Sequence, residues 1–85
     1  MIVDSVRGSG SLQKLLLAKD SDGHFKVMRQ AANRRPTQLI GHMAEQAAMA
    51  AWRKLLIMHY ASITNTKEAE ELATHRVANI SSSLH

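Results

Sequence analysis

The chain has 85 residues and a formal net charge of +4, and 45% of its residues are hydrophobic, a share typical of a globular domain. It contains no cysteine, which excludes disulfides and thiolate metal sites, and a domain of this size has only a thin core. Its few aromatic residues are outnumbered by Ala, Leu, Ile and Met, which favour helix over strand. The composition therefore predicts an all-α fold.

We expect a small bundle of three main helices with a short N-terminal helix and a long central helix. Residues 1–10 are expected to form a flexible or extended N-terminal segment, and residues 11–85 a single helical domain. Ile2 and Val3 could pair as a short strand, but no later segment has the pattern of a partner strand. Ser11 can cap the short first helix. Three leucines of that helix have helical spacing: Leu12, Leu15 and Leu16.

A turn and a second helix follow. Residues 20–23, Asp-Ser-Asp-Gly, are typical of a turn and provide a cap for the next element. A helix is expected from His24 to Asn33, because the apolar and polar side chains of this segment separate onto two sides at helical periodicity. The apolar side holds Phe25, Val27, Met28, Ala31 and Ala32.

Pro36 separates this helix from the central one, because proline disfavours helix in the residue before it and suits the first turn of a new helix. The central helix is expected over residues 37–63. Asn65, followed three residues later by Glu68, resembles a capping box and begins a last helix over residues 65–83.

The central helix has two apolar faces, and a helix that is apolar all round must be buried all round. An alanine-rich face is expected to form the core of the monomer: Ile40, Met43, Ala44, Ala47, Ala51, Leu55 and Met58. The opposite side has the spacing of two heptads, and we call it the Trp52 seam: Met49, Trp52, Leu56, Tyr60 and Ile63. Either other helices of the same chain cover this seam, or it is a surface for association.

The Trp52 seam leads us to expect a small helical protein–protein interaction module: a self-associating subunit, an adaptor or an inhibitor. Its aromatic pair among aliphatic side chains is the usual composition of an interface anchor. The expected partner is another protein or a second copy of the chain.

A basic surface supports an alternative function, a small nucleic-acid-binding regulator or antitoxin that acts as a dimer. Residues 1–54 hold nine of the eleven Lys and Arg residues against four acidic ones. Four cations lie on one face of the second expected helix and on the adjoining turn: Lys26, Arg29, Arg34 and Arg35. They could neutralise several phosphates of a nucleic acid, or they could form an ordinary solvated face.

Residues 25–40 resemble the ribbon-helix-helix family of dimeric DNA-binding regulators and antitoxins. The resemblance consists of Phe25 and Met28, then Asn33-Arg34, then Thr37 with Leu39-Ile40, at the spacing of that family's first helix, turn and second helix. It implies a dimer that binds DNA, and it assigns no base-contacting residue in this chain.

No metal ligand, cofactor-binding residue or catalytic residue is expected. The five histidines include no pair at the i, i+4 spacing that a zinc site on a helix uses, and Glu45 is the only acid of the expected central helix. No nucleophile–base pair or carboxylate pair stands out, since cysteine is absent and acids are sparse outside residues 68–71. We therefore expect neither an enzyme nor a small-molecule substrate.

No membrane segment is expected either. The longest apolar stretch, residues 47–63, is too short to span a bilayer comfortably and carries Arg53 and Lys54 at its centre. The first residues lack the basic start of a secretory signal, so a cytoplasmic location is expected.

Overall fold

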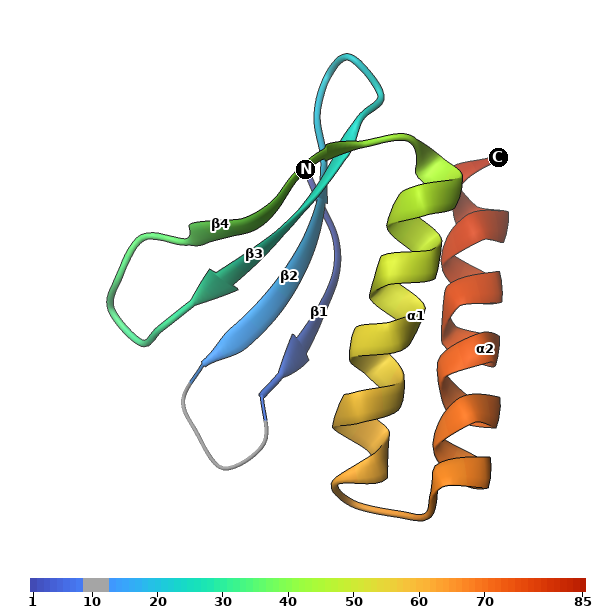
Figure 1. Cartoon of the computed structure of the whole chain (residues 1–85). Helices are drawn as coiled ribbons and strands as arrows, with labels where there is room; N and C mark the ends of the chain where they lie inside the picture. Colours follow the sequence, from blue (N-terminus) through green and yellow to red (C-terminus); the bar gives the residue numbers. More distant parts are fainter. Residues whose placement is uncertain (9–12) are drawn as a thin grey trace. The chain divides into compact units, whose positions relative to one another are not determined.

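The computed structural model describes residues 1–8 and 13–85, and it shows a four-stranded sheet followed by two helices (Figure 1). The elements are β1 (Ile2–Arg7), β2 (Lys14–Lys19), β3 (Phe25–Gln30), β4 (Thr37–Met43), α1 (Glu45–Ala61) and α2 (Thr66–Leu84). The chain divides into two compact units: Met1–Ala48 holds the sheet, and Met49–His85 holds α2 with all but the first turn of α1. The predicted all-α bundle is therefore wrong.

The sheet is an antiparallel meander in which each strand pairs with the next along the chain. The β2–β3 ladder is regular over its whole length, from Lys14 opposite Gln30 to Lys19 opposite Phe25. β1 is a true partner of β2, so the expectation that Ile2 and Val3 have no partner strand is wrong. The β3–β4 register shifts twice, which makes β4 an irregular edge strand.

One face of the sheet carries the core of the first unit. Leu17 lies directly opposite Val27, and both side chains are fully buried, as is Phe25 two residues before Val27. Val6 of β1 is buried on the same face, because its partner Leu15 precedes Leu17 by two positions. These side chains give the sheet an apolar face across three strands.

The second predicted helix is a strand because its short apolar pattern fits both periodicities. Phe25 and Val27 are fully buried and alternate with the partly exposed Lys26 and Met28, which is the period of two that a strand requires. Over six residues the same side chains also fall on one side of a helix, and only the long-range pairing with β2 decides between the two. The resemblance to ribbon-helix-helix proteins fails for the same reason, since residues 25–40 form β3, a loop and the start of β4.

The first predicted helix is also replaced by a strand. Leu15 and Leu16 belong to β2, in which three consecutive residues from Leu16 to Ala18 are buried. A continuous apolar run of this length does not distinguish a buried strand from a buried helix. Ser11 and Leu12, the expected cap and first leucine of that helix, lie outside the described residues, as does the end of the Gly/Ser-rich stretch.

The turn predicted over residues 20–23 is present and connects β2 to β3. The backbone N–H of Gly23 donates to the carbonyl of Asp20 at 3.0 Å, and Gly23 has a φ of 87°, in the left-handed region that glycine adopts without strain. The turn is therefore a hairpin connection, where we expected a break between two helices.

The last predicted helix is confirmed as α2. The side chain of Asn65 caps it by accepting a hydrogen bond from the backbone N–H of Glu68 at 2.8 Å. The central helix is confirmed only over α1, since the expected first turns, residues 37–43, form β4. The guanidinium of Arg53 donates to the Thr74 hydroxyl at 3.1 Å and links α1 to α2.

The alanine-rich face of α1 is not the core that was expected of it, whereas the Trp52 seam, for which cover within the chain was one of two alternatives, supplies three buried side chains. Trp52 and Leu56 of the Trp52 seam are fully buried and Met49 nearly so, whereas Met58 of the alanine-rich face is 70% exposed.

Among the described residues, no helix is long and apolar enough to cross a membrane.

Candidate nucleic-acid interface

Five cationic residues gather at one end of the sheet, where β1 and β3 end and β2 and β4 begin (Figure 1). We call this set the basic end: Arg7, Lys14, Arg29, Arg34 and Arg35. All five are exposed, and the segments that carry them, residues 5–8, 13–15 and 28–38, contain no acid. Across the part of the chain that the structure describes, none of the five side chains has an ion pair or a hydrogen bond.

Two of these cations face each other across neighbouring strands. Arg7 of β1 lies directly opposite Lys14 of β2, and Lys14 lies directly opposite Gln30 of β3. Like charges at directly opposed positions of a sheet are destabilising. The pair therefore costs the isolated fold some stability, and an anion bound between the two side chains would remove that cost.

The loop from β3 to β4 extends the basic end. Its turn is fixed by Asn33, which has a φ of 60°, and by a hydrogen bond from the backbone N–H of Arg34 to the carbonyl of Ala31 at 3.2 Å. Gln30 donates to the Arg34 carbonyl at 3.4 Å, so the end of β3 holds the loop. An open hollow of about 310 Å³ lies here and is lined by Arg7, Lys14, Gln30, Ala31, Ala32 and Asn33.

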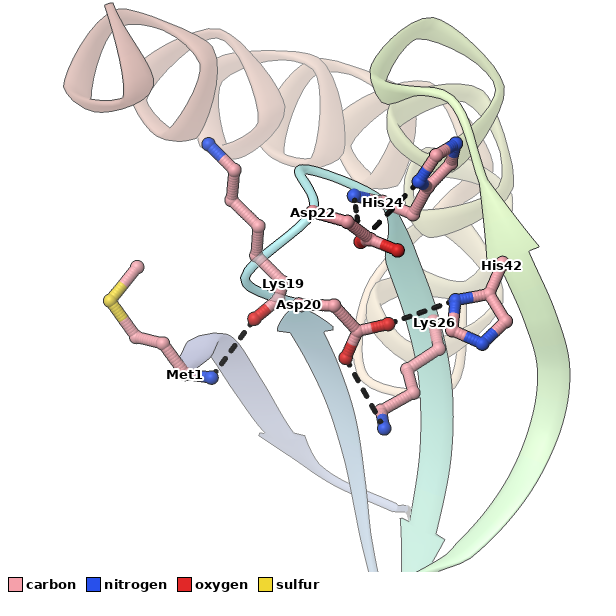
Figure 2. Close-up of polar contacts among 7 residues, drawn as sticks. All are labelled: Met1, Lys19, Asp20, Asp22, His24, Lys26 and His42. Atoms are coloured by element: carbon pink, nitrogen blue, oxygen red, sulfur yellow. Dashed lines mark hydrogen bonds and ion pairs between the residues drawn. The ribbon is translucent and has the colours of Figure 1, made fainter.

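The opposite end of the sheet carries a different cluster, shown in Figure 2. Asp20, at the end of β2, has its carboxylate between Lys26 of β3 and His42 of β4, with Oδ1 at 3.4 Å from the Lys26 ammonium and Oδ2 at 2.9 Å from Nδ1 of His42. Asp22 and His24 form a second close pair in the turn, with 3.3 Å between Oδ1 and Nδ1. Lys26 is thus paired with an acid and lies apart from the basic end.

Comparisons with protein-family models, with curated proteins and with solved structures find no match to this chain. Its function is inferred from its own side chains.

The structure places three of the four cations that the sequence assigned to nucleic-acid contact at this end of the sheet, although Arg29, directly opposite Leu15, lies on the other face of the sheet from Lys14. Arg29, Arg34 and Arg35 belong to the basic end, and Lys26 does not. Sequence reasoning missed Arg7, because residues 1–10 were treated as a separate segment. The signal was available: Arg7 and Lys14 flank a Gly-Ser-Gly-Ser stretch, which is typical of a hairpin connection that would place them opposite each other.

The residues of the Trp52 seam differ in how far they are exposed to solvent. Met49, Trp52 and Leu56 are buried within the single chain. Tyr60 is partly buried, and its hydroxyl accepts a hydrogen bond from Arg76 at 3.0 Å. Ile63 is the one seam residue that is largely exposed.

The pKa of the Asp22 carboxyl reports on the hydrogen bonds of the β2–β3 turn. The backbone N–H of His24 donates to Oδ1 of Asp22 at 3.1 Å, and this bond is the main reason that the pKa of Asp22 lies below its usual 3.8. The His24 imidazole lowers this pKa further, while desolvation opposes both effects. Because the folded-state pKa is the lower one, the stabilisation is present above the usual pKa and is lost as the pH falls through the lowered value.

We expect an NMR titration of the side-chain carboxyl of Asp22 to give a pKa below 3.8 in the folded protein. A chelator is added so that no metal ion from the buffer binds the carboxylate. In His24→Ala most of this depression should remain, because the backbone N–H that causes it is retained. A return of the Asp22 pKa to its usual value in His24→Ala would show that the imidazole, and not the backbone, dominates.

Proposed function

We propose that this chain binds nucleic acid through the basic end of its sheet. The observation that carries the proposal is the directly opposed pair Arg7 and Lys14, extended by the loop arginines, with no acid in the same segments. Such a surface is what a sugar–phosphate backbone requires, since phosphate contacts by Lys and Arg supply most of the sequence-independent affinity for DNA. The proposed role is binding and not catalysis.

The arrangement of the cations favours a backbone-tracking mode. Arg7 and Lys14 lie on adjacent strands, and Arg34 and Arg35 follow in the loop beyond β3, so successive phosphates could each meet one cation. Gln30 and Asn33, which line the hollow beside Arg7 and Lys14, add amide donors and acceptors of the kind that also bond base edges.

The protein-interaction function expected from the sequence has less support, because three residues of the Trp52 seam are already buried in one chain. A partner that used this seam would have to replace contacts that the chain makes with itself. Protein association thus stays a prediction, and the basic end supports the nucleic-acid function better.

The test is a fluorescence-anisotropy titration of a labelled, random-sequence DNA duplex at several salt concentrations. Each phosphate contact contributes about −0.9 to the slope of log K against log salt concentration, so the full basic end gives a slope of roughly −3 to −4.5. The double variant Arg34→Ala/Arg35→Ala should bind more weakly and lose about 1.8 of that slope.

The matched control is Lys54→Ala/Lys67→Ala, which removes the same charge from exposed positions of α1 and α2. This variant should retain the wild-type slope if the basic end is the binding surface. No binding at low salt, or equal losses in the two double variants, would contradict the proposal. Parallel titrations with single-stranded DNA and with duplex RNA identify the form that binds most tightly.

A further inference from the structure

The cluster at the other end of the sheet contains the side chains of a metal site. Asp20, Asp22 and His42 each offer one ligand atom, and these three atoms lie within 4.8 Å of one another. They come from the end of β2, from the β2–β3 turn and from β4, on both sides of β3 (Figure 2). The sequence hides this set, because histidines were compared only at helical spacing and His42 was assigned to a helix.

A second observation concerns Oδ2 of Asp20. This oxygen is shielded from solvent and has no hydrogen-bond partner among the described residues, although Nδ1 of His42 lies only 2.9 Å away. Two donor atoms bound to one metal ion at about 2.1 Å lie roughly 3.0–3.4 Å apart, close to the separation of this pair. A cation held between them would satisfy both.

The surroundings orient the remaining groups. Lys26 lies near Oδ1 of Asp20, which leaves Oδ2 facing His42. The backbone N–H and the imidazole of His24 hold Oδ1 of Asp22, and hydrogen bonds of this kind fix ligating carboxylates in metal sites. His24 and His42 also meet edge to face, with ring centroids 6.3 Å apart. The turn is exposed, so Asp22 can move the short distance that closes the ligand set.

We propose that Asp20, Asp22 and His42 bind one divalent first-row transition metal ion, with Zn²⁺ as the representative. Two carboxylates and one imidazole form a mixed oxygen and nitrogen set, which suits Zn²⁺, Co²⁺ or Ni²⁺ better than Mg²⁺, which prefers oxygen ligands and keeps its waters. Three protein ligands leave positions open to water. The bound ion would connect the end of β2 to β4 across β3, and so would stabilise the irregular edge strand.

The test is isothermal titration calorimetry of the untagged chain with ZnCl₂ near neutral pH. We expect one ion per chain, a melting temperature that rises with Zn²⁺, and no competition from Mg²⁺. His42→Ala and Asp20→Asn should each weaken Zn²⁺ binding by about tenfold or more. The matched control is His75→Ala, an exposed histidine of α2 near acidic residues, which should bind as wild type does.

A measurement on the wild-type chain avoids any effect of the substitutions on folding. Substoichiometric Co²⁺ should shift or broaden the amide signals of residues 20–24 and 42 before those of the rest of the chain. Failure of the wild type to bind Zn²⁺ at submillimolar concentration would overturn the proposal. So would wild-type affinity in a folded His42→Ala, or paramagnetic effects centred on His75. Loss of the metal site would leave nucleic-acid binding by the basic end unaffected.

Discussion

Replacing Trp52 with alanine is expected to lower the free energy of unfolding by about 3–5 kcal/mol. Trp52 is fully buried, and it is the largest of the fully buried side chains. Truncation removes the apolar contacts of the indole and leaves a cavity that the surrounding side chains fill only in part. A small domain is stable by about 5–15 kcal/mol, so the loss is a large share of the total.

Urea denaturation monitored by circular dichroism measures this loss, and it should be the same at low and at high protein concentration. Met58→Ala is the control on the same helix, because Met58 is 70% exposed and its truncation should change stability by less than about 0.5 kcal/mol. A Trp52→Ala variant of unchanged stability that only dissociates from an oligomer would place Trp52 in an interface instead of a core.

The helical part of the fold could be predicted from the sequence because its signals are local. Asn65 and Glu68 are three residues apart, and the capping bond between them forms as expected. Ala69, Ala73 and Ile80, the buried residues of α2, recur at helical spacing. In these cases the signal, a cap or a periodicity, lies within a single helix.

The sheet could not be predicted in the same way, because its strands are stabilised by partners that are distant in the chain. Six residues of β2 or β3 fit a helix as well as a strand, and the composition favours helix. The choice is made when Leu17 meets Val27 across the ladder. The alanine-rich face of α1 was likewise wrongly expected to form the core, since both faces of the helix are apolar and periodicity alone does not rank them.

The candidate sites show the same division between local and distant information. The charge asymmetry and three cations of the basic end were apparent from the sequence. The opposition of Arg7 and Lys14 depends on the β1–β2 register, and the approach of Asp20 to His42 depends on the positions of β2 and β4 in the sheet. Both features are products of tertiary structure, and only the first has a local sequence signal, the Gly-Ser-Gly-Ser stretch between Arg7 and Lys14.

Phe25→Ala is expected to destabilise the sheet by about 3–5 kcal/mol, an effect as large as that of Trp52→Ala. Phe25 is fully buried at the start of β3, directly opposite Lys19 of β2. The Lys19 ammonium lies 5.6 Å from the centre of the ring, within the range of a cation–π interaction. Most of the loss should come from the buried ring, since a cation–π contact at a partly exposed site contributes only about 0.5–1 kcal/mol.

A double-mutant cycle with Lys19→Met separates the two contributions. Lys19→Met keeps much of the apolar stem and removes the charge, so it should lower the free energy of unfolding by no more than about 1 kcal/mol, with a coupling to Phe25→Ala of the same size. Leu39→Ala on β4 is the control for a truncated apolar side chain, because Leu39 is exposed and its loss should cost little. A coupling energy well above 1 kcal/mol would mean that the ammonium, and not the burial of the ring, anchors the start of β3. If Phe25→Ala lost no more stability than Leu39→Ala, this end of the sheet would lack the packed core that the fully buried ring implies.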